Sequence, residues 1–346
     1  MSARIATGKS ALSRRSVLGG IGAAAAVTLS GLPARTQSLT RVHISTALRL
    51  ANYTPAYIAL REGIFEKHGL AVEVTAASSV AEPISILNAG RAEFAMTGTG
   101  MAVNSAIEGA DTKVIAKMAG AIGLWFISRP GVRVTSLDDL KGKTIASYRF
   151  PSNTVSSPTY AMRSVGGFDP AATGVRFLEG PFGSIIPAVV DGRADLGCVF
   201  EWDASIAEVV HGLEVSLPLA EVLGPIAFTS TLVSSRYAER NPEVVQAFVN
   251  ALAESMELLH ADPEVYRRVS TAEFDQVPPE AIAAGTQRLL SAEGVVPRNP
   301  MITREEWDAI IAHDTAAGTV RGERTYDQLV DMSFAQRAIE VIANGG

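Results

Sequence analysis

Alternating apolar and polar residues show where the chain is expected to form strands. Residues 41–47 read Arg-Val-His-Ile-Ser-Thr-Ala, and this period of two predicts a β-strand. Thr54-Pro55 predicts a helix over 56–62, because proline is favoured in a first helical turn. Similar patterns predict strands over 71–75, 94–97, 113–118, 144–148, 174–178 and 229–234, with helices over 101–108 and directly after 152–154. Strands and helices that alternate in this way predict an α/β fold.

A six-residue pattern occurs twice. Residues 90–95 read Gly-Arg-Ala-Glu-Phe-Ala, and residues 192–197 read Gly-Arg-Ala-Asp-Leu-Gly. Each copy follows a stretch with helical apolar spacing, so its first glycine is expected to end a helix in the left-handed conformation. The apolar residues after each acid predict a strand. Two copies of one helix–turn–strand step predict two similar lobes, and a cleft between lobes is a candidate site for a small molecule.

Two apolar segments are expected to connect the lobes, one over 120–129 and one over 221–228. The first lobe is then formed by 41–121 together with 222–346, and the second lobe by 122–221. From Pro242 onward the chain is predicted to be helical, over 242–260, 263–273, 279–291, 303–312 and 326–343. These helices are expected to pack on the first lobe, because the chain has already returned to it.

Residues 1–34 differ from the rest of the chain. They contain Arg4, Lys9, Arg14 and Arg15, no acidic residue, and then an apolar run too short for a confident membrane span. Ser13 to Leu18 resembles a twin-arginine export signal. This predicts a signal peptide cleaved near residue 34 and a protein exported to the periplasm. The alternative is an uncleaved anchor helix.

Composition and side-chain spacing exclude several classes of protein. With a net charge of −6 over 346 residues, nothing indicates binding to nucleic acid or to an anionic membrane. Cys198 is the single cysteine, so no intramolecular disulfide forms, and its apolar neighbours predict burial. The five histidines show no metal-ligand spacing, and no Ser/His/Asp arrangement is visible. We therefore expect no metal, no cofactor and no catalytic residue.

Several short motifs carry a resemblance to a known family. They are Pro55–Ala59, Gly63-Ile64-Phe65, His68-Gly69-Leu70, Gly90–Glu93, 137–143, Gly192–Asp195 and Asn241–Val245. In this order they resemble the nitrate/sulfonate/taurine-type periplasmic binding proteins, which are grouped with proteins similar to the thiamine-pyrimidine synthases of yeast. The resemblance covers most of 41–262. It implies a type II periplasmic binding fold that delivers a small solute to the permease and ATPase of an ABC importer.

Ligands of open α/β sheets bind beyond the carboxyl ends of the strands, so the candidate binding residues lie there. In the first lobe the candidates are Arg49, Asn52, Tyr53, Ser78, Gly98 and Thr99. In the second lobe they are Arg149, Ser152, Asn153, Thr154, Glu201 and Trp202. Segments 97–100 and 200–202 follow equivalent strands of the two repeats, so they are expected to face one another across the cleft.

The charged candidates leave the class of ligand open. Arg49 and Arg149 favour a sulfonate or related organic anion, since guanidinium groups pair with such acids through two hydrogen bonds. Glu201 and Asp203 favour instead a pyrimidine-like or amine-bearing heterocycle. An enzyme of the thiamine-pyrimidine type and a ligand sensor that docks on a membrane receptor are further alternatives. The preferred hypothesis is a monomeric binding protein that closes about its two crossovers.

Overall fold

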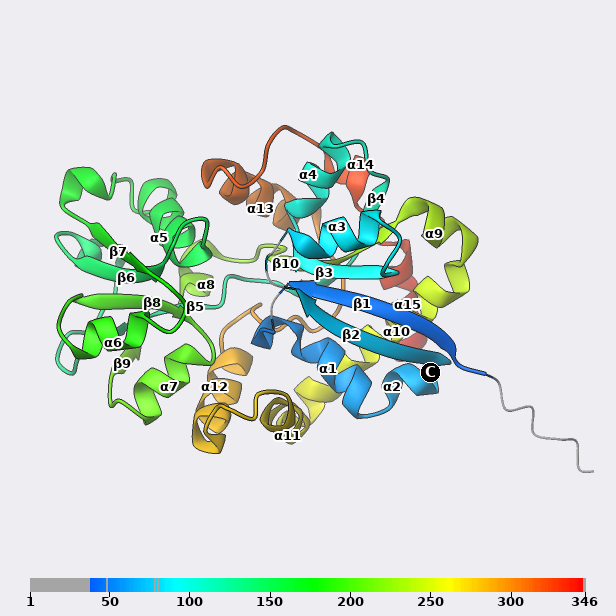
Figure 1. Cartoon of the computed structure of the whole chain (residues 1–346), viewed down its shortest axis with the longest axis horizontal. Coiled ribbons are helices and arrows are strands. Elements are labelled where there is room, and N and C mark those ends of the chain that lie inside the picture. The colour runs from blue at the N-terminus through cyan, green and yellow to red at the C-terminus, as the bar shows by residue number, and fades with distance from the viewer. Residues whose placement is uncertain (1–37, 48, 78, 80, 345–346) are drawn as a thin grey trace, which may run out of the picture. The chain divides into compact units, whose positions relative to one another are not determined.

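Two five-stranded mixed sheets organise the part of the chain that this computed structural model describes, residues 38–344 without 48, 78 and 80 (Figure 1). The predicted signal peptide lies outside the described residues. The first sheet has the order β2 (Leu70–Ala77), β1 (Thr40–Ala47), β3 (Phe94–Gly98), β10 (Thr229–Ser234) and β4 (Thr112–Ala119). In it, β1 is parallel to β2 and β3, while β10 runs antiparallel to β3 and β4.

The second sheet repeats the plan of the first. Its order is β7 (Arg176–Gly180), β6 (Thr144–Tyr148), β8 (Leu196–Phe200), β5 (Leu124–Ser128) and β9 (Glu214–Ser216). Here β6 is parallel to β7 and β8, and β5 runs antiparallel to β8 and β9. The predicted α/β fold is confirmed, and each sheet contains one antiparallel strand in the same place.

The repeated sequence pattern occupies the same position in both sheets. Gly90 and Gly192 have φ of +66° and +74°, the left-handed conformation expected where helices α3 (Glu82–Asn88) and α6 (Ile185–Val190) end. Strands β3 and β8 begin a few residues later. The glycine of each copy therefore reverses the chain from a helix into a strand.

The acid of each repeat fixes that strand to its parallel neighbour. The Glu93 carboxylate accepts a hydrogen bond from the His43 backbone N–H at 2.7 Å, and the Glu93 N–H donates to the His43 carbonyl at 3.1 Å. Asp195 makes the same two bonds with Thr144, at 2.8 and 2.9 Å. The acids thus satisfy backbone donors at the start of the ladder, which explains why both copies carry a carboxylate.

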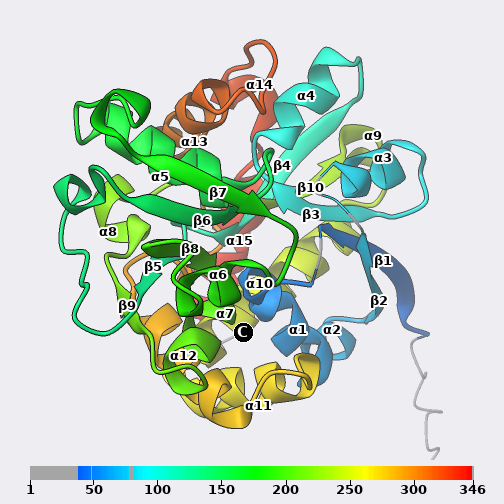
Figure 2. The same ribbon diagram turned by 60° about the vertical axis from the view of Figure 1, so that its left-hand side comes forward.

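The helices cover the faces of the two sheets and connect the strands (Figure 2). Those not yet given are α1 (Thr54–Arg61), α2 (Ile64–Lys67), α4 (Met101–Ile107), α5 (Asn153–Ser164), α7 (Asp203–Val209), α8 (Leu219–Leu223), α9 (Ser235–Arg240), α10 (Pro242–Ala261), α11 (Pro263–Glu273), α12 (Pro279–Ser291), α13 (Arg304–Ala316), α14 (Tyr326–Leu329) and α15 (Ser333–Ala343). Short 3₁₀ turns occupy Ala51–Tyr53, Leu137–Leu140 and Ala171–Thr173. Within the described residues, no helix is both long enough and apolar enough to span a bilayer.

Three predicted segments differ from the structure, one of them the crossover over 221–228, whose first residues belong to helix α8. The predicted crossover over 120–129 is wrong for 124–128, which form β5; all five residues are buried, so the strand shows no alternating pattern. The predicted helix over 326–343 is interrupted between α14 and α15, because Val330 forms a β-bridge with Val114 of β4.

The C-terminal helices do not all pack on the first sheet as expected. Helices α10 and α15 pack together there, and Phe248 of α10 stacks on Phe94 of β3 with ring centroids 3.9 Å apart. Helix α12 instead contacts α7, a helix of the half with the second sheet. Helix α13 contacts both halves, through Lys117 of β4 and through α5 (Figures 1 and 2). The end of the chain therefore joins the two halves of the molecule.

Candidate functional site

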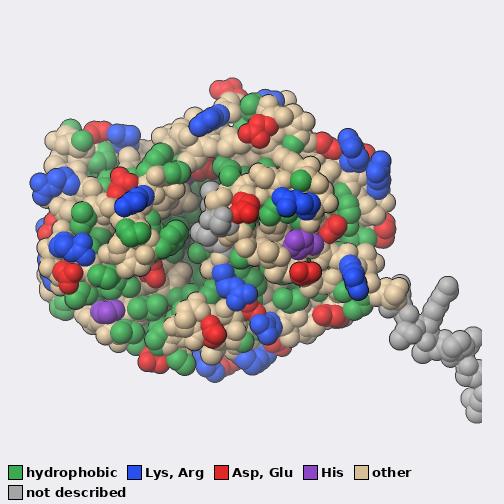
Figure 3. All heavy atoms as spheres, in the orientation of Figure 1, with side chains coloured by type: hydrophobic (Ala, Val, Ile, Leu, Met, Phe, Trp, Pro, Cys, Tyr) green, Lys and Arg blue, Asp and Glu red, His purple; other side chains and the backbone are tan. Residues whose placement is uncertain are grey.

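A cavity of about 280 Å³ is lined by residues from both sheets. Gly98, Tyr148, Gly180 and Phe200 lie in its wall, each at the carboxyl end of a strand, and Thr229 begins β10. Figure 3 shows the surface hollowed between the two halves, with hydrophobic side chains along the hollow. The cavity therefore lies where ligands of open α/β sheets are found.

Half of the sequence-predicted site residues line this cavity. They are Asn52, Tyr53, Gly98, Arg149, Ser152 and Asn153. The first three come from the half with the first sheet and the last three from the half with the second. The structure thus brings together candidates that are far apart in the sequence, and their contact with a ligand stays a prediction.

Three other predicted residues are engaged elsewhere. Thr99 is fully buried, and its hydroxyl bonds to Ser230 at 2.6 Å. Thr154 is also fully buried, and its hydroxyl accepts from the Tyr148 backbone N–H at 2.9 Å. Arg49 pairs with Glu273, at 3.3 Å between guanidinium and carboxylate. None of the three lines the cavity, and Ser78 lies outside the described residues.

Glu201 and Trp202 require a correction, because neither lies in the cavity wall. The Glu201 carboxylate is buried, pairs with Arg288 of α12 and accepts from the Ser205 hydroxyl at 2.6 Å. Burial raises the pKa of Glu201, and the positive charge of Arg288 opposes that rise. Trp202 packs on Phe274, with ring centroids 5.4 Å apart. Phe200 is the residue of this segment that lines the cavity, so the expected acidic wall is absent at this strand end.

Sequence analysis missed the aromatic side chains and one acid. Tyr148, Phe182 and Phe228 line the cavity beside Phe200, and Asp314 of α13 supplies a carboxylate. The strand-end rule could have identified Tyr148, which ends β6. No sequence signal indicates Asp314, because a helix from the C-terminal region brings it to the site.

Asp314 belongs to a hydrogen-bonded chain of three side chains. The Ser157 hydroxyl lies 3.0 Å from His313 Nε2, and His313 Nδ1 lies 2.9 Å from the Asp314 carboxylate. These are the residue types of a catalytic triad, but Ser157 and His313 are fully buried and only Asp314 lines the cavity. The chain of bonds therefore joins α5 to α13 and orients the acid, without presenting a nucleophile.

Several polar groups of the cavity wall have no partner among the described residues. They are the Arg149 guanidinium, the Asn52 amide, the Tyr53 hydroxyl and the Thr229 hydroxyl, the last of which is also shielded from solvent. All four can donate hydrogen bonds. Buried donors are normally satisfied, so the buried Thr229 hydroxyl indicates a missing partner. Arg149 is exposed and Asn52 half-buried, so both are free to reach a bound acceptor.

The sequence matches the family model described as NMT1/THI5 like over residues 50–265. This is more than half of the chain. The chain belongs to the NMT1/THI5-like family. The family match includes both repeats and most of the cavity wall, whereas Ile310, Asp314 and Thr319 lie beyond it. A search of curated proteins finds no significant match.

Solved structures similar to this NMT1/THI5-like protein share its fold. A periplasmic sulfonate-binding protein SsuA from Methylobacillus flagellatus KT has a TM-score of 0.69 and 18% identity, covering 89% of this chain and 96% of that chain. The periplasmic aliphatic sulphonate binding protein SsuA from Escherichia coli has a TM-score of 0.64 and 16% identity, covering 81% and 86%. The periplasmic nitrate-binding protein NrtA from Synechocystis PCC 6803 has a TM-score of 0.63 and 14% identity, covering 88% and 89%. The fold is that of periplasmic binding proteins, as the sequence resemblance implied.

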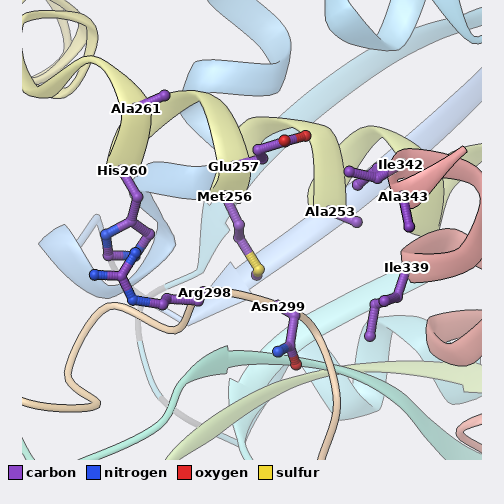
Figure 4. A pocket seen from close by; sticks show the side chains of 10 residues that line it. All are labelled: Ala253, Met256, Glu257, His260, Ala261, Arg298, Asn299, Ile339, Ile342 and Ala343. Atoms are coloured by element: carbon purple, nitrogen blue, oxygen red, sulfur yellow. The ribbon is translucent and has the colours of Figure 1, made fainter. Parts of the chain in front are cut away.

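A second cavity of about 470 Å³ lies between α10, α15 and residues 298–299 of this NMT1/THI5-like chain (Figure 4). In Figure 4 the side chains of His260 and Arg298 lie next to one another at its edge. Burial and the nearby Arg298 lower the pKa of His260. No residue of the second sheet lines this cavity, so a ligand there would not connect the two halves. Within the described residues, no group of side chains could hold a metal ion.

Gly98, which ends β3, and Gly100, which immediately precedes α4, make a matched test of how closely α13 packs on this loop. A methyl group on Gly100 would stand 2.2 Å from the Asp314 carboxylate and 2.6 Å from Val320, whereas one on Gly98 meets no atom within 4 Å. We expect Gly100→Ala to lower the free energy of unfolding by about 1–3 kcal/mol, the usual cost of overpacking. Gly98→Ala is the control and should unfold like the wild type in urea. Equal stability of the two variants would contradict the close packing of α13 against this loop.

Proposed function

We propose that this protein is the solute-binding component of an ABC importer and captures a small organic anion in the cavity between its two halves. One observation carries the proposal. Unpaired hydrogen-bond donors from both halves line a single cavity, and Arg149 adds a positive charge. A ligand that contacts both halves at once stabilises the closed arrangement of such a protein.

The surroundings of Arg149 support an anionic ligand. Arg149 lies four residues before α5, whose N-cap Ser152 and first residue Asn153 also line the cavity. Backbone N–H groups and the dipole at a helix N-terminus favour negative charge, and a guanidinium can pair with a carboxylate or sulfonate. Sulfonate-binding and nitrate-binding proteins among the similar structures are consistent with this class of ligand.

Asp314 favours a second candidate, a binding protein for an amine-bearing or pyrimidine-like heterocycle. Its carboxylate lines the cavity and could accept a hydrogen bond from an amine or ring N–H. This role was expected of Glu201 and Asp203. Glu201 is buried against Arg288, and the Asp203 carboxylate accepts from the Tyr148 hydroxyl instead. We favour the anion because the Arg149 guanidinium can only donate hydrogen bonds and carries a positive charge.

We infer binding without catalysis. The candidate nucleophiles Cys198 and Ser157 are both fully buried. Burial also raises the pKa of the Cys198 thiol, which disfavours the reactive thiolate. The proposal therefore includes no cofactor and no catalytic residue.

The proposal includes the organisation predicted from the sequence. One lobe is formed by 41–121 with 222–346 and the other by 122–221, and they close about the two connections. Residues 1–34 direct export to the periplasm by the twin-arginine route. The mature protein acts as a monomer that hands its ligand to a membrane permease and ATPase.

Calorimetry on the purified protein tests this function. The panel is propanesulfonate, benzenesulfonate, acetate, benzoate, nitrate and cytosine. We expect an organic acid to bind, and we expect Arg149→Ala to weaken it by roughly ten-fold or more, since hydrogen bonds to charged groups contribute about 1.5–3 kcal/mol. Asn153→Ala should also weaken it, by a smaller factor.

Arg163→Ala is the matched control for Arg149. Arg163 lies at the other end of α5, outside the cavity wall, and pairs with Asp169 at 2.8 Å. This variant should bind like the wild type. The proposed function fails if no organic acid binds, if cytosine alone binds, or if Arg149→Ala retains full affinity.

A further inference from the structure

Five aromatic side chains line the cavity, and they come from both halves of the molecule. Tyr53 and Phe228 belong to the half with the first sheet, and Tyr148, Phe182 and Phe200 to the half with the second. A site for a small inorganic or short aliphatic anion needs donors but does not need such walls. Aromatic rings contribute extra stabilisation when they stack on another ring.

Two of these rings form a pair across the cleft. Phe200 ends β8, Phe228 immediately precedes β10, and their ring centroids lie 6.3 Å apart with planes inclined by only 25°. Carbon atoms of stacked rings lie about 3.5–4.0 Å apart, so a flat ring held between two others needs centroids roughly 7 Å apart. Phe200 and Phe228 are thus nearly parallel and come from opposite halves, which suits a planar ring placed against both.

Phe182 adds an aromatic group at the edge of the site. It lines the cavity although its side chain is 71% exposed, and it packs on Tyr148 with ring centroids 4.4 Å apart. A large exposed apolar side chain gains stability when a ligand covers it. Phe182 is therefore suited to cover the outer face of an apolar ligand.

The charges at the cavity limit the substituents of such a ligand. Arg149 has no partner among the described residues, and it forms no ion pair with Asp314 although both line the cavity. One acidic group can therefore pair with Arg149 near the start of α5. A second acidic group would meet the Asp314 carboxylate, and like charges at close range repel.

We propose that the cleft selects an aromatic ring that carries one acidic group, an aromatic monocarboxylate or monosulfonate. The ring lies between Phe200 and Phe228, and the acid pairs with Arg149. The cavity is large enough for such a ligand. A cavity of about 150 Å³ holds a benzene ring, and this one measures about 280 Å³. The inference rests on the proposed function and specifies its substrate class.

Pairs of acids that differ in one property test whether the site prefers an aromatic ring with a single acidic group. Calorimetry on the purified protein compares benzoate with cyclohexanecarboxylate, which has the same charge and nearly the same size, and benzoate with terephthalate. We expect benzoate to bind about ten-fold more tightly than cyclohexanecarboxylate, from stacking on two rings. Terephthalate should bind at least ten-fold more weakly than benzoate. In the Asp314→Asn variant the affinities for terephthalate and benzoate should be more similar.

Variants of Phe200 and Phe228 test whether these two rings cause the preference for benzoate. Phe200→Leu and Phe228→Leu keep an apolar side chain of similar volume, so we expect them to fold and to lose the preference for benzoate. Phe168→Leu is the control, since Phe168 belongs to the same half as Phe200 but lies outside the cavity wall. It should retain the preference. Circular dichroism of each variant checks that it is folded.

The outcomes separate this inference from the proposed function. Equal binding of benzoate and cyclohexanecarboxylate would overturn the aromatic preference and leave an organic-anion binding protein. A preference that survives both Phe200→Leu and Phe228→Leu would overturn the assignment to these rings. Failure of every acid to bind would overturn the proposed function as well.

Discussion

Replacing Arg288 by alanine is expected to lower the free energy of unfolding by about 3–5 kcal/mol, because it leaves a buried carboxylate without its counter-charge. Arg288 lies on α12 and pairs with Glu201, whose side chain is only 1% exposed, and with Glu208 on α7. Its guanidinium also donates to the Ser205 hydroxyl at 3.0 Å. The variant loses the group that joins α12 to the half with the second sheet. Urea unfolding followed by circular dichroism measures the loss.

The pH dependence of unfolding tests whether the unpaired Glu201 carboxylate causes the loss of stability in Arg288→Ala. Burial raises the pKa of Glu201 in the wild type, and the loss of Arg288 removes the main charge that opposes the rise. A carboxyl group whose pKa is higher in the folded than in the unfolded state stabilises the fold at low pH. That stability is lost as the pH rises from the unfolded pKa through the folded pKa. The deficit of Arg288→Ala should therefore be smaller at pH 5 than at pH 8.

Two further variants complete the test of Arg288. Arg267→Ala removes an exposed arginine of α11 that pairs with Glu264 at 2.6 Å, and it should unfold like the wild type. The double variant Arg288→Met/Glu201→Gln removes both charges and should be clearly more stable than Arg288→Ala. A single Arg288→Ala variant as stable as Arg267→Ala would contradict the role of the buried pair.

Lys117→Met is expected to lower the free energy of unfolding by about 3 kcal/mol for a similar reason. Lys117 of β4 and Glu306 of α13 form an ion pair in which each side chain is 11% exposed. Glu306 also accepts from the Thr303 backbone N–H at 2.8 Å, so the pair holds the start of α13 on the first sheet. The same helix carries Asp314 into the cavity wall. Urea unfolding of the variant measures the change.

Lys113 provides the matched control for Lys117, on the same strand. Its ammonium group is exposed and donates to the Gln328 carbonyl at 2.5 Å, so Lys113→Met leaves no buried charge unpaired. We expect it to change stability by well under 1 kcal/mol, as surface interactions of this kind do. If Lys113→Met and Lys117→Met were equally destabilising, burial of the Lys117–Glu306 pair would not be the cause.

Features set by local chemistry could be predicted from the sequence. The two glycine-led repeats predicted the helix–turn–strand step correctly, because a left-handed residue and the acid after it act within a few residues and one neighbouring strand. Strand β5 could not be predicted as a strand. It is buried on both faces, so its apolar run lacks the alternation that reveals strands with one exposed face.

Contacts between residues far apart in the sequence limited the prediction of the candidate site. Glu201 and Trp202 follow β8 in the manner of binding residues, but Phe274, which follows α11, and Arg288 of α12 cover them. Asp314 reaches the cavity from α13, far from any strand end in the sequence. Strand ends therefore predicted Asn52, Tyr53 and Arg149 as cavity residues, whereas contacts made by the C-terminal helices could not be inferred from local pattern.

The position of β10 also constrains the order in which the protein can be assembled during synthesis. The second sheet uses a continuous segment, from β5 to β9, whereas the first sheet is complete only when β10 inserts between β3 and β4. A ribosome has therefore released the entire second sheet before it supplies the strand that joins β3 to β4. Of the two sheets, the one encoded in the middle of the gene is the first that the nascent chain can finish.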